Sequence, residues 1–234
     1  MSGREQFITV LNLAKKEGRN FLLEPECDEI LRAYGIPVID SFFVKTQEEA
    51  AEVARKLGSP LVEKVVSPDV VHKSDVGGVK VNVNGEKEAA DAFAQIRDSL
   101  KEKMPGARFY GVYIQKMLSG GVETIVGATR DPQFGPVVVF GLGGIFVEVL
   151  KDVSFRVAPI GLEEGLDMID EIRAAPILNG VRGMKPVDKK SLAAVLVAVG
   201  ELLIENQEIS SLDLNPVMAL PEKAVAVDSR IILG

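Results

Sequence analysis

The short turns in the second half of the chain constrain its fold more than any other feature of the sequence. Strand-like segments at 122–130, 136–141 and 145–150 are separated only by the turn formers DPQFG and LGG. Parallel neighbours need a crossover of about a dozen residues or more, so these strands are expected to pair antiparallel. Helical and further strand patterns complete this half at 163–173, 188–205, 210–220 and 224–233. The prediction is a mixed sheet with helices packed on it, in the α+β class.

The first half of the chain changes its period several times. Pro25 and Gly35 frame one helix, and Thr46 with Glu49 predicts a capping box that opens another, ending at Gly58. The predicted elements are helices at 4–17, 25–34, 47–57 and 86–103, and strands at 60–66, 79–85 and 108–118. We expect one unit of two lobes around a cleft.

The lobes are assigned by a candidate hinge near 116–121, where Gly120 and Gly121 begin the second half. The N-terminal lobe is expected at about 20–116 and carries a long loop at 67–79, which we call the His72 loop. The C-terminal lobe is expected at about 117–234, with the helix in residues 1–19 packed on it. All of residues 1–234 would then form one functional unit.

Charge and cysteine content narrow the classes of partner. A formal net charge of −7 argues against nucleic acids and anionic membranes, which are bound by an excess of Lys and Arg. The single cysteine, Cys27, cannot form an internal disulfide, and the N-terminal sequence has no long apolar stretch. We therefore expect a cytoplasmic protein. Cys27 lies at helical spacing from Ile30, Leu31 and Tyr34, which predicts a packed core thiol.

Lys64 stands inside the apolar strand pattern at 60–66. An ammonium buried there without a partner would be costly, so it either binds an anion such as a nucleotide phosphate or lies on a half-exposed strand face. Its neighbour Glu63 must point to the opposite face and is expected to be solvated.

The only histidine, His72, lies in the segment SPDVVHKSDVGG. Turn formers, Lys73 and Asp75 surround it, so cations and backbone N–H groups could bind a phosphoryl group while a carboxylate orients the imidazole. Neutral imidazole can accept a phosphoryl group and deliver it elsewhere. The alternative is an ordinary surface histidine.

Glycines and two glutamates in the second half suggest contacts to a ligand. The turn that contains Gly141, Gly143 and Gly144 would let backbone amides approach phosphate, although glycine turns between strands are common. Glu123 and Glu148 interrupt apolar strand patterns, where a carboxylate needs a metal, a hydroxyl or a cation, unless it simply faces outward.

The C-terminal segment SLDLNPV places Asp213 and Asn215 on one face of a strand, and Pro216 is expected to end its pairing. Asp228 interrupts the next strand pattern. If these strands are adjacent, Asn215 and Asp228 could supply oxygen ligands to Mg²⁺. The alternative makes Asn215–Pro216 a turn and Asp228 the start of another.

Taken together, these segments resemble one family. They are Lys64, VSPDVVHKSDVGGV, YIQKM followed by Glu123, TRDPQFGPVVVFGLGGIFVEVLKD, DLNPV and AVAVDSR. In this order they look like the ATP-grasp (beta) subunit of ADP-forming acetyl-CoA synthetase (acetate–CoA ligase), in the succinyl-CoA synthetase superfamily. The resemblance covers nearly the whole chain and implies an ATP-grasp fold of two α+β lobes that enclose a nucleotide cleft.

The resemblance implies a reaction in which acyl-CoA, ADP and phosphate give an acid, ATP and CoA through phosphohistidine, with Mg²⁺. Lys64 would contact the phosphates of ATP or ADP, and Glu123 would lie in the nucleotide cleft. The adenine would be lined by Gln115, Lys116, Met117 and Leu118.

The same resemblance implies that Asn215 and Asp228 hold Mg²⁺ and that His72 carries the phosphoryl group. Asp213 would lie near His72 when the group reaches the nucleotide, although succinyl-CoA synthetases have a glutamate there.

The family's CoA-binding domains lie on an alpha subunit, so a partner chain and an α2β2 heterotetramer are implied. The acid and the choice between ADP and GDP stay open. Two alternatives also remain: another ATP-grasp ligase that forms an acyl phosphate without needing His72, and a nucleotide-sensing regulatory module.

Overall fold

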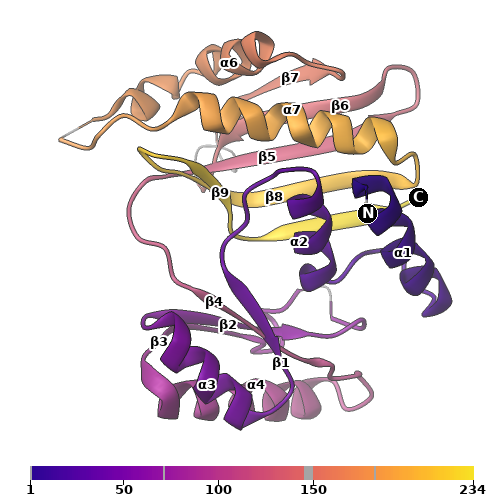
Figure 1. The fold of residues 1–234 in the computed structure, drawn as a ribbon, viewed down its shortest axis with the longest axis vertical. Helices are drawn as coiled ribbons and strands as arrows, with labels where there is room; N and C mark the ends of the chain where they lie inside the picture. The colour runs from indigo at the N-terminus through magenta and orange to yellow at the C-terminus, as the bar shows by residue number, and fades with distance from the viewer. Residues whose placement is uncertain (1, 71, 145–149, 182) are drawn as a thin grey trace. The chain divides into compact units, whose positions relative to one another are not determined.

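The computed structural model describes residues 2–70, 72–144, 150–181 and 183–234 (Figure 1). The chain divides into two compact units. The smaller unit comprises Leu23–Pro25 and Ile39–Ser119, and the larger comprises Met1–Leu22, Glu26–Val38 and Gly120–Gly234. Residues 26–38, expected in the N-terminal lobe, thus group with the C-terminal half, because Cys27, Ile30 and Leu31 are buried in the core of the larger unit.

The smaller unit is a four-stranded antiparallel sheet in the order β1-β4-β2-β3, with two helices packed on it. Its elements are β1 (Ser41–Val44), α3 (Gln47–Leu57), β2 (Leu61–Val66), β3 (Val79–Val83), α4 (Gly85–Lys103) and β4 (Gly111–Lys116). The Thr46 side chain accepts from the N–H of Glu49, as predicted, whereas the Glu49 carboxylate accepts from the N–H of Lys45. The sequence patterns did not predict β1.

The two faces of this sheet differ. Leu61, Glu63 and Val65 alternate along β2 toward α3 and α4, with which the apolar members of this set form one buried cluster. We call this side the helix face. Lys64 points to the other side, together with its register partner Tyr113, and we call that side the lysine face. A residue's position along β2 therefore decides whether it lies in the core.

The larger unit is a six-stranded sheet in the order β10-β8-β5-β6-β7, with β9 paired to β8. Its strands are β5 (Val122–Asp131), β6 (Gly135–Leu142), β7 (Val153–Val157), β8 (Ile209–Ala219), β9 (Ala224–Ala226) and β10 (Ser229–Leu233). The helices are α1 (Gly3–Lys16), α2 (Glu24–Ala33), α6 (Leu162–Glu171), the short η1 (Ala175–Asn179) and α7 (Lys189–Glu205). The first two residues of α2 belong to the smaller unit. Figure 1 shows α7 running along β5 and β6. The core contains inward residues of β5, β6 and β8 together with apolar residues of α1, α2 and α7.

The antiparallel pairing expected from the short turns is confirmed for β5 and β6, which pair from Thr124–Leu142 to Asp131–Gly135. The sheet is not mixed, however, because every pair of named strands in the described part of the chain is antiparallel. Residues 145–149 of the strand expected at 145–150 lie outside the described residues. The edge strand β7 was not predicted.

The expectation that Pro216 would end strand pairing is wrong. β8 continues through it to Ala219, and Val217 pairs with both Thr124 and Ala226. The β5–β8 register shifts at this point, where an N–H is not needed, and the Pro216 carbonyl accepts from Val227. The alternative of a turn at Asn215–Pro216 is therefore wrong.

Among the described residues, no helix combines the length and apolarity needed to cross a membrane.

Candidate functional site

Lys64 is held on the lysine face by a carboxylate from a distant part of the sequence. Its Nζ lies 2.7 Å from Oε1 of Glu24, and the two residues are only 5% and 6% exposed. The second carboxylate oxygen of Glu24 accepts from Nζ of Lys73, in the His72 loop. All three residues belong to the smaller unit. The half-exposed position considered for Lys64 is therefore wrong, since its ammonium is buried and paired.

Two lysines share one carboxylate in this group, which we call the Glu24 cluster. Burial opposes ionisation of Glu24, but the positive charges of Lys64 and Lys73 outweigh it and hold the pKa of the carboxyl below its ordinary value. Two ammonium groups gathered on one carboxylate are of the kind that binds phosphate oxygens.

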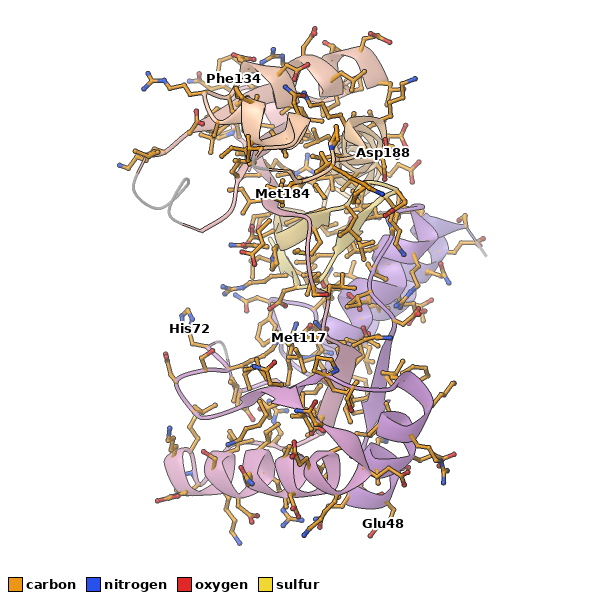
Figure 2. All side chains as sticks on the ribbon, turned by 90° about the vertical axis from the view of Figure 1, so that its left-hand side faces the viewer. Glu48, His72, Met117, Phe134, Met184 and Asp188 are labelled. Atoms are coloured by element: carbon orange, nitrogen blue, oxygen red, sulfur yellow. The ribbon has the colours of Figure 1, made fainter. Side chains whose placement is uncertain are left out.

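His72 lies beside this cluster in sequence and is exposed to solvent. Figure 2 shows its imidazole projecting outward from the loop, away from the ribbon. The loop is fixed before the histidine by Asp69, whose carboxylate accepts from the backbone and guanidinium of Arg108. These bonds hold the pKa of Asp69 at about 2. An accessible imidazole on an anchored loop can meet a phosphoryl donor.

The loop is also fixed after the histidine. Ser99 Oγ donates to the carbonyl of Val76 at 2.8 Å, and Lys103 Nζ donates to the carbonyl of Asp75 at 3.0 Å. Gly77 has φ +67°, and a Cβ there would lie 2.5 Å from Ser99 Oγ, so the glycine is required by both backbone and packing. The Asp75 carboxylate is exposed, and its predicted role in orienting the imidazole stays untested.

The segment predicted to line an adenine leaves the sheet at the end of β4. Gln115 is 2% exposed and lies on the lysine face, because it pairs with Val62, two residues before Lys64. Lys116 is exposed, while Met117 and Leu118 are partly buried. The N–H of Met117 donates to the carbonyl of Pro60 and so extends the pairing beyond the strand. Contact of these four residues with adenine stays a prediction.

In the larger unit, Glu123 borders a hollow of about 340 Å³. The hollow is lined by Gly121, Val122, Glu123, Leu142, Gly143, Gly144, Ile177 and Met184. The Glu123 side chain is exposed, and its carbonyl accepts from the N–H of Gly143 at 2.8 Å. Glu123 and two of the predicted glycines therefore border one concave site within this unit. Its use for a nucleotide remains a prediction.

Local structure explains separately why positions 141, 143 and 144 are glycine. Gly141 is inside β6, and a Cβ there would lie 2.9 Å from Val153 Cγ1, so packing of β7 already requires a glycine. Gly143 is tightly placed beside Glu123, and Gly144 has φ +60°. A phosphate-binding turn at these positions thus stays a prediction. Glu148 lies outside the described residues.

Asp213 and Asn215 lie on the same exposed face of β8, as predicted, because Leu212 and Leu214 alternate with them into the core. Asp228 is brought close: its carbonyl accepts from the N–H of Asn215 at 3.2 Å. Asp228 also lies in a bend and accepts from the N–H of Ser229, as the turn alternative expected.

The charges in this region suit a hard cation. Burial by surrounding atoms and then the negative charge of Asp228 raise the pKa of Asp213, although its side chain is accessible, while Arg230 opposes the shift. A cation near the two carboxylates would relieve their repulsion, and the amide oxygen of Asn215 adds a ligand of the type Mg²⁺ prefers. In the described part of the chain, no set of three or more His, Cys, Asp or Glu forms a complete metal site. The residues therefore fit Mg²⁺ whose remaining ligands are phosphate oxygens and water.

Two residues were misjudged or missed from the sequence. Glu63, expected to be solvated, is 0% exposed on the helix face, because that face is the one covered by α3 and α4. Glu24 was not identified at all. Its only local signal is an acidic residue at the start of a helix, which normally indicates favourable interaction with the helix dipole.

Comparisons with known proteins agree with this arrangement. The model of the ATP-grasp domain family matches residues 13–233. The chain is 52% identical over 224 residues to the acetate–CoA ligase (ADP-forming) I subunit beta of Pyrococcus furiosus, covering 96% of each chain.

Two solved structures of acetyl-coenzyme A synthetase 1 from Ca. Korarchaeum cryptofilum are similar to this chain. One, in complex with coenzyme A, Ca-AMPCP and HgCl⁺, has TM-score 0.92 and 48% identity, covering 97% of this chain and 99% of that one. Another, in complex with coenzyme A and Mg-AMPPCP, has its phosphohistidine segment pointing towards the nucleotide binding site. It has TM-score 0.85 and 45% identity, with full coverage of both chains (100% each).

Proposed function

Because this chain belongs to the ATP-grasp family, among the beta subunits of ADP-forming acetate–CoA ligases, we propose that it is the nucleotide-binding subunit of an ADP-forming acyl-CoA synthetase. The observation that carries the proposal is the Glu24 cluster, in which the residue after the only histidine shares a carboxylate with the buried Lys64. The lysine proposed to bind phosphate is thus linked through Glu24 to the loop that carries the proposed phosphoryl acceptor.

The reaction converts acyl-CoA, phosphate and ADP into an acid, CoA and ATP. Phosphate attacks the acyl carbonyl and the C–S bond breaks, which gives an acyl phosphate and CoA. The phosphoryl group then moves to a histidine nitrogen of the partner chain as the acid leaves, and a nitrogen of His72 takes it from there as that N–P bond breaks. An oxygen of the ADP β-phosphate finally takes the group from His72 as the second N–P bond breaks. His72 is exposed, so a phosphoryl donor can reach its imidazole directly.

The other residues bind and orient the nucleotide in this proposal. Lys64 contacts its phosphates, the segment from Gln115 to Leu118 lines the adenine, and Glu123 with the neighbouring glycine turn borders the site. Asn215 and Asp228 hold Mg²⁺, which when bound neutralises charge on the phosphate oxygens. Asp213 is the acidic residue that we propose to act with His72 during transfer.

A partner chain supplies CoA binding and the first phosphoryl transfer. Support for this comes from the beta-subunit identity of the relative that shares 52% of its aligned residues with this chain. An assembly of two such chains with two partner chains is the stoichiometry we propose, with acetate as the simplest acid.

The test is phosphoryl transfer from radiolabelled ATP with Mg²⁺ to the purified chain, alone and with the CoA-binding partner. We expect acid-labile, alkali-stable label on this chain that disappears in His72→Asn. Ser119→Ala, a change of another exposed polar residue in the same unit, is the matched control and should keep the label. Full synthetase activity in His72→Asn would instead support direct ligation through an acyl phosphate. Nucleotide binding without label on either chain would support a sensor.

A further inference from the structure

Glu24 occupies an unusual position for a buried carboxylate. It is the first residue of α2, and each of its oxygens is bonded to a different lysine, Lys64 on β2 and Lys73 in the His72 loop. The lysines are 40 and 49 residues away in sequence. One buried group therefore joins the strand that carries the proposed phosphate-binding lysine to the loop that carries the proposed phosphoryl carrier.

The ion pair to Lys73 is placed where it can control the loop. Asp69 and Val76 fix the two ends of the segment, through Arg108 and Ser99 respectively. Lys73 lies between those ends and next to His72. Breaking its bond to Glu24 would remove one restraint from the middle of the loop and leave both ends attached, so the histidine could move without unfolding of the unit.

Charge makes the Glu24 cluster responsive to phosphate. A phosphate oxygen near Lys64 competes with Glu24 for that ammonium. Without Glu24, phosphate would no longer compete with this carboxylate for Lys64, but Lys73 would lose its bond to Glu24 and would be repelled by Lys64. Glu24 thus has opposite effects on nucleotide binding and on loop position.

We infer that Glu24 is a positioning residue that sets the His72 loop through Lys73 while it orients Lys64 for the nucleotide phosphates, an inference that rests on the proposed function. The loop bound to Glu24 is one of the positions that the phosphoryl carrier occupies. Binding of phosphate at Lys64 weakens the Glu24 contacts and lets the loop leave this position. The hold on the loop through Lys73 acts on the rate of transfer, and the contact with Lys64 acts on nucleotide affinity.

The experiment measures three quantities on Glu24→Gln and Lys73→Met: the affinity for Mg-ATP by calorimetry, single-turnover labelling of His72, and hydrogen exchange of the backbone at residues 70–76. In Glu24→Gln we expect labelling to fall about tenfold and loop exchange to rise by a similar factor, while nucleotide binds about threefold more tightly. In Lys73→Met, labelling and exchange should change in the same directions without the gain in affinity. The double variant should be no worse than the more affected single variant.

Matched controls exist for both changes. Glu26→Gln alters a paired carboxylate on the same helix, bound to Arg19, and Lys189→Met removes a partly buried ammonium bound to Asp170. Both should leave the three quantities within about twofold of wild type.

The results separate this inference from the proposed function. Parallel loss of nucleotide affinity and labelling in Glu24→Gln would show a purely structural role and overturn it. Unchanged loop exchange in Lys73→Met would also overturn it, and this variant serves if Glu24→Gln fails to fold. If the wild type accepts no label, the proposed function fails, yet the affinity and exchange measurements still decide whether Glu24 holds the loop.

Discussion

Glu63 and Lys64 are adjacent in β2, and their surroundings are opposite. Both are nearly inaccessible to solvent, at 0% and 5% exposure. Lys64 lies on the lysine face with a carboxylate 2.7 Å away, whereas neither carboxylate oxygen of Glu63 has a hydrogen-bond partner among the described residues. Burial of a charged residue type is therefore not in itself a sign of function; the presence of partners distinguishes the two positions.

The two buried carboxyl groups of the smaller unit show what partners do. The lysines hold the pKa of Glu24 below its ordinary value, whereas burial among apolar side chains raises the pKa of Glu63 to about 8. At neutral pH one group is an anion and the other is mostly a neutral acid. Only the first can order cations for a phosphate.

Replacing Lys64 should have the largest effect. Lys64→Met keeps the length of the side chain and removes its charge, so we expect kcat/KM to fall about 100-fold or more, equivalent to about 3 kcal/mol of transition-state stabilisation. Steady-state kinetics with the partner chain would measure it. Near-normal activity of Lys64→Met would contradict the comparison, since the lysine face would then be no more functional than the helix face.

Replacing Glu63 should change stability rather than activity. Its folded pKa of about 8 lies above the ordinary value of 4.5, so the folded state holds a proton that the unfolded state releases. The associated stability is complete below pH 4.5 and is lost as the pH rises toward 8. At pH 7 the loss amounts to about 3 kcal/mol.

Glu63→Met and Glu63→Gln should both remove this pH dependence. Glu63→Met should therefore gain about 3 kcal/mol relative to wild type between pH 5 and pH 8, with kcat unchanged. Chemical denaturation across this pH range measures the difference. An equal pH dependence in wild type and both variants would mean that Glu63 has a partner after all.

Replacing Lys80 should have the smallest effect, and it tests directly whether Glu63 has a charged partner. It is half-buried and lies directly opposite Glu63 on β3. If Glu63 is neutral, Lys80→Met should change the free energy of unfolding by less than about 1 kcal/mol and leave its pH dependence intact. A steeper pH dependence in Lys80→Met would reveal an ion pair between the two residues.

Much of the fold is predictable because local signals agree with tertiary packing. Predicted helices at 4–17, 86–103 and 188–205 correspond within one residue at each end to α1, α4 and α7. The strands β1 and β7 were missed because they are short edge strands whose pairing depends on distant neighbours. Pro216 was misjudged because a sequence does not show where a register shift makes an N–H unnecessary.

The candidate site divides in the same way. Lys64, Asp213 and Asn215 are recognisable from polar residues within apolar alternation, and His72 from its glycine-ended loop. Alternation alone could not tell which face of β2 is the core, since Val62, Val65 and Val66 leave both faces apolar, and Glu63 was therefore misplaced. Glu24 could not be found, because its partners are far away in the chain.

The anchors of the His72 loop set a tether length for the phosphoryl carrier. His72 is three residues after Asp69 and four before Val76. At about 3.5 Å per extended residue, its Cα stays within roughly 10 Å of the first anchor and roughly 14 Å of the second. Two stopping points of that Cα can therefore be no more than about 20 Å apart while Asp69 remains bonded to Arg108. If His72 must move farther than this, either the bond between Asp69 and Arg108 opens or the two sites that His72 visits move toward each other.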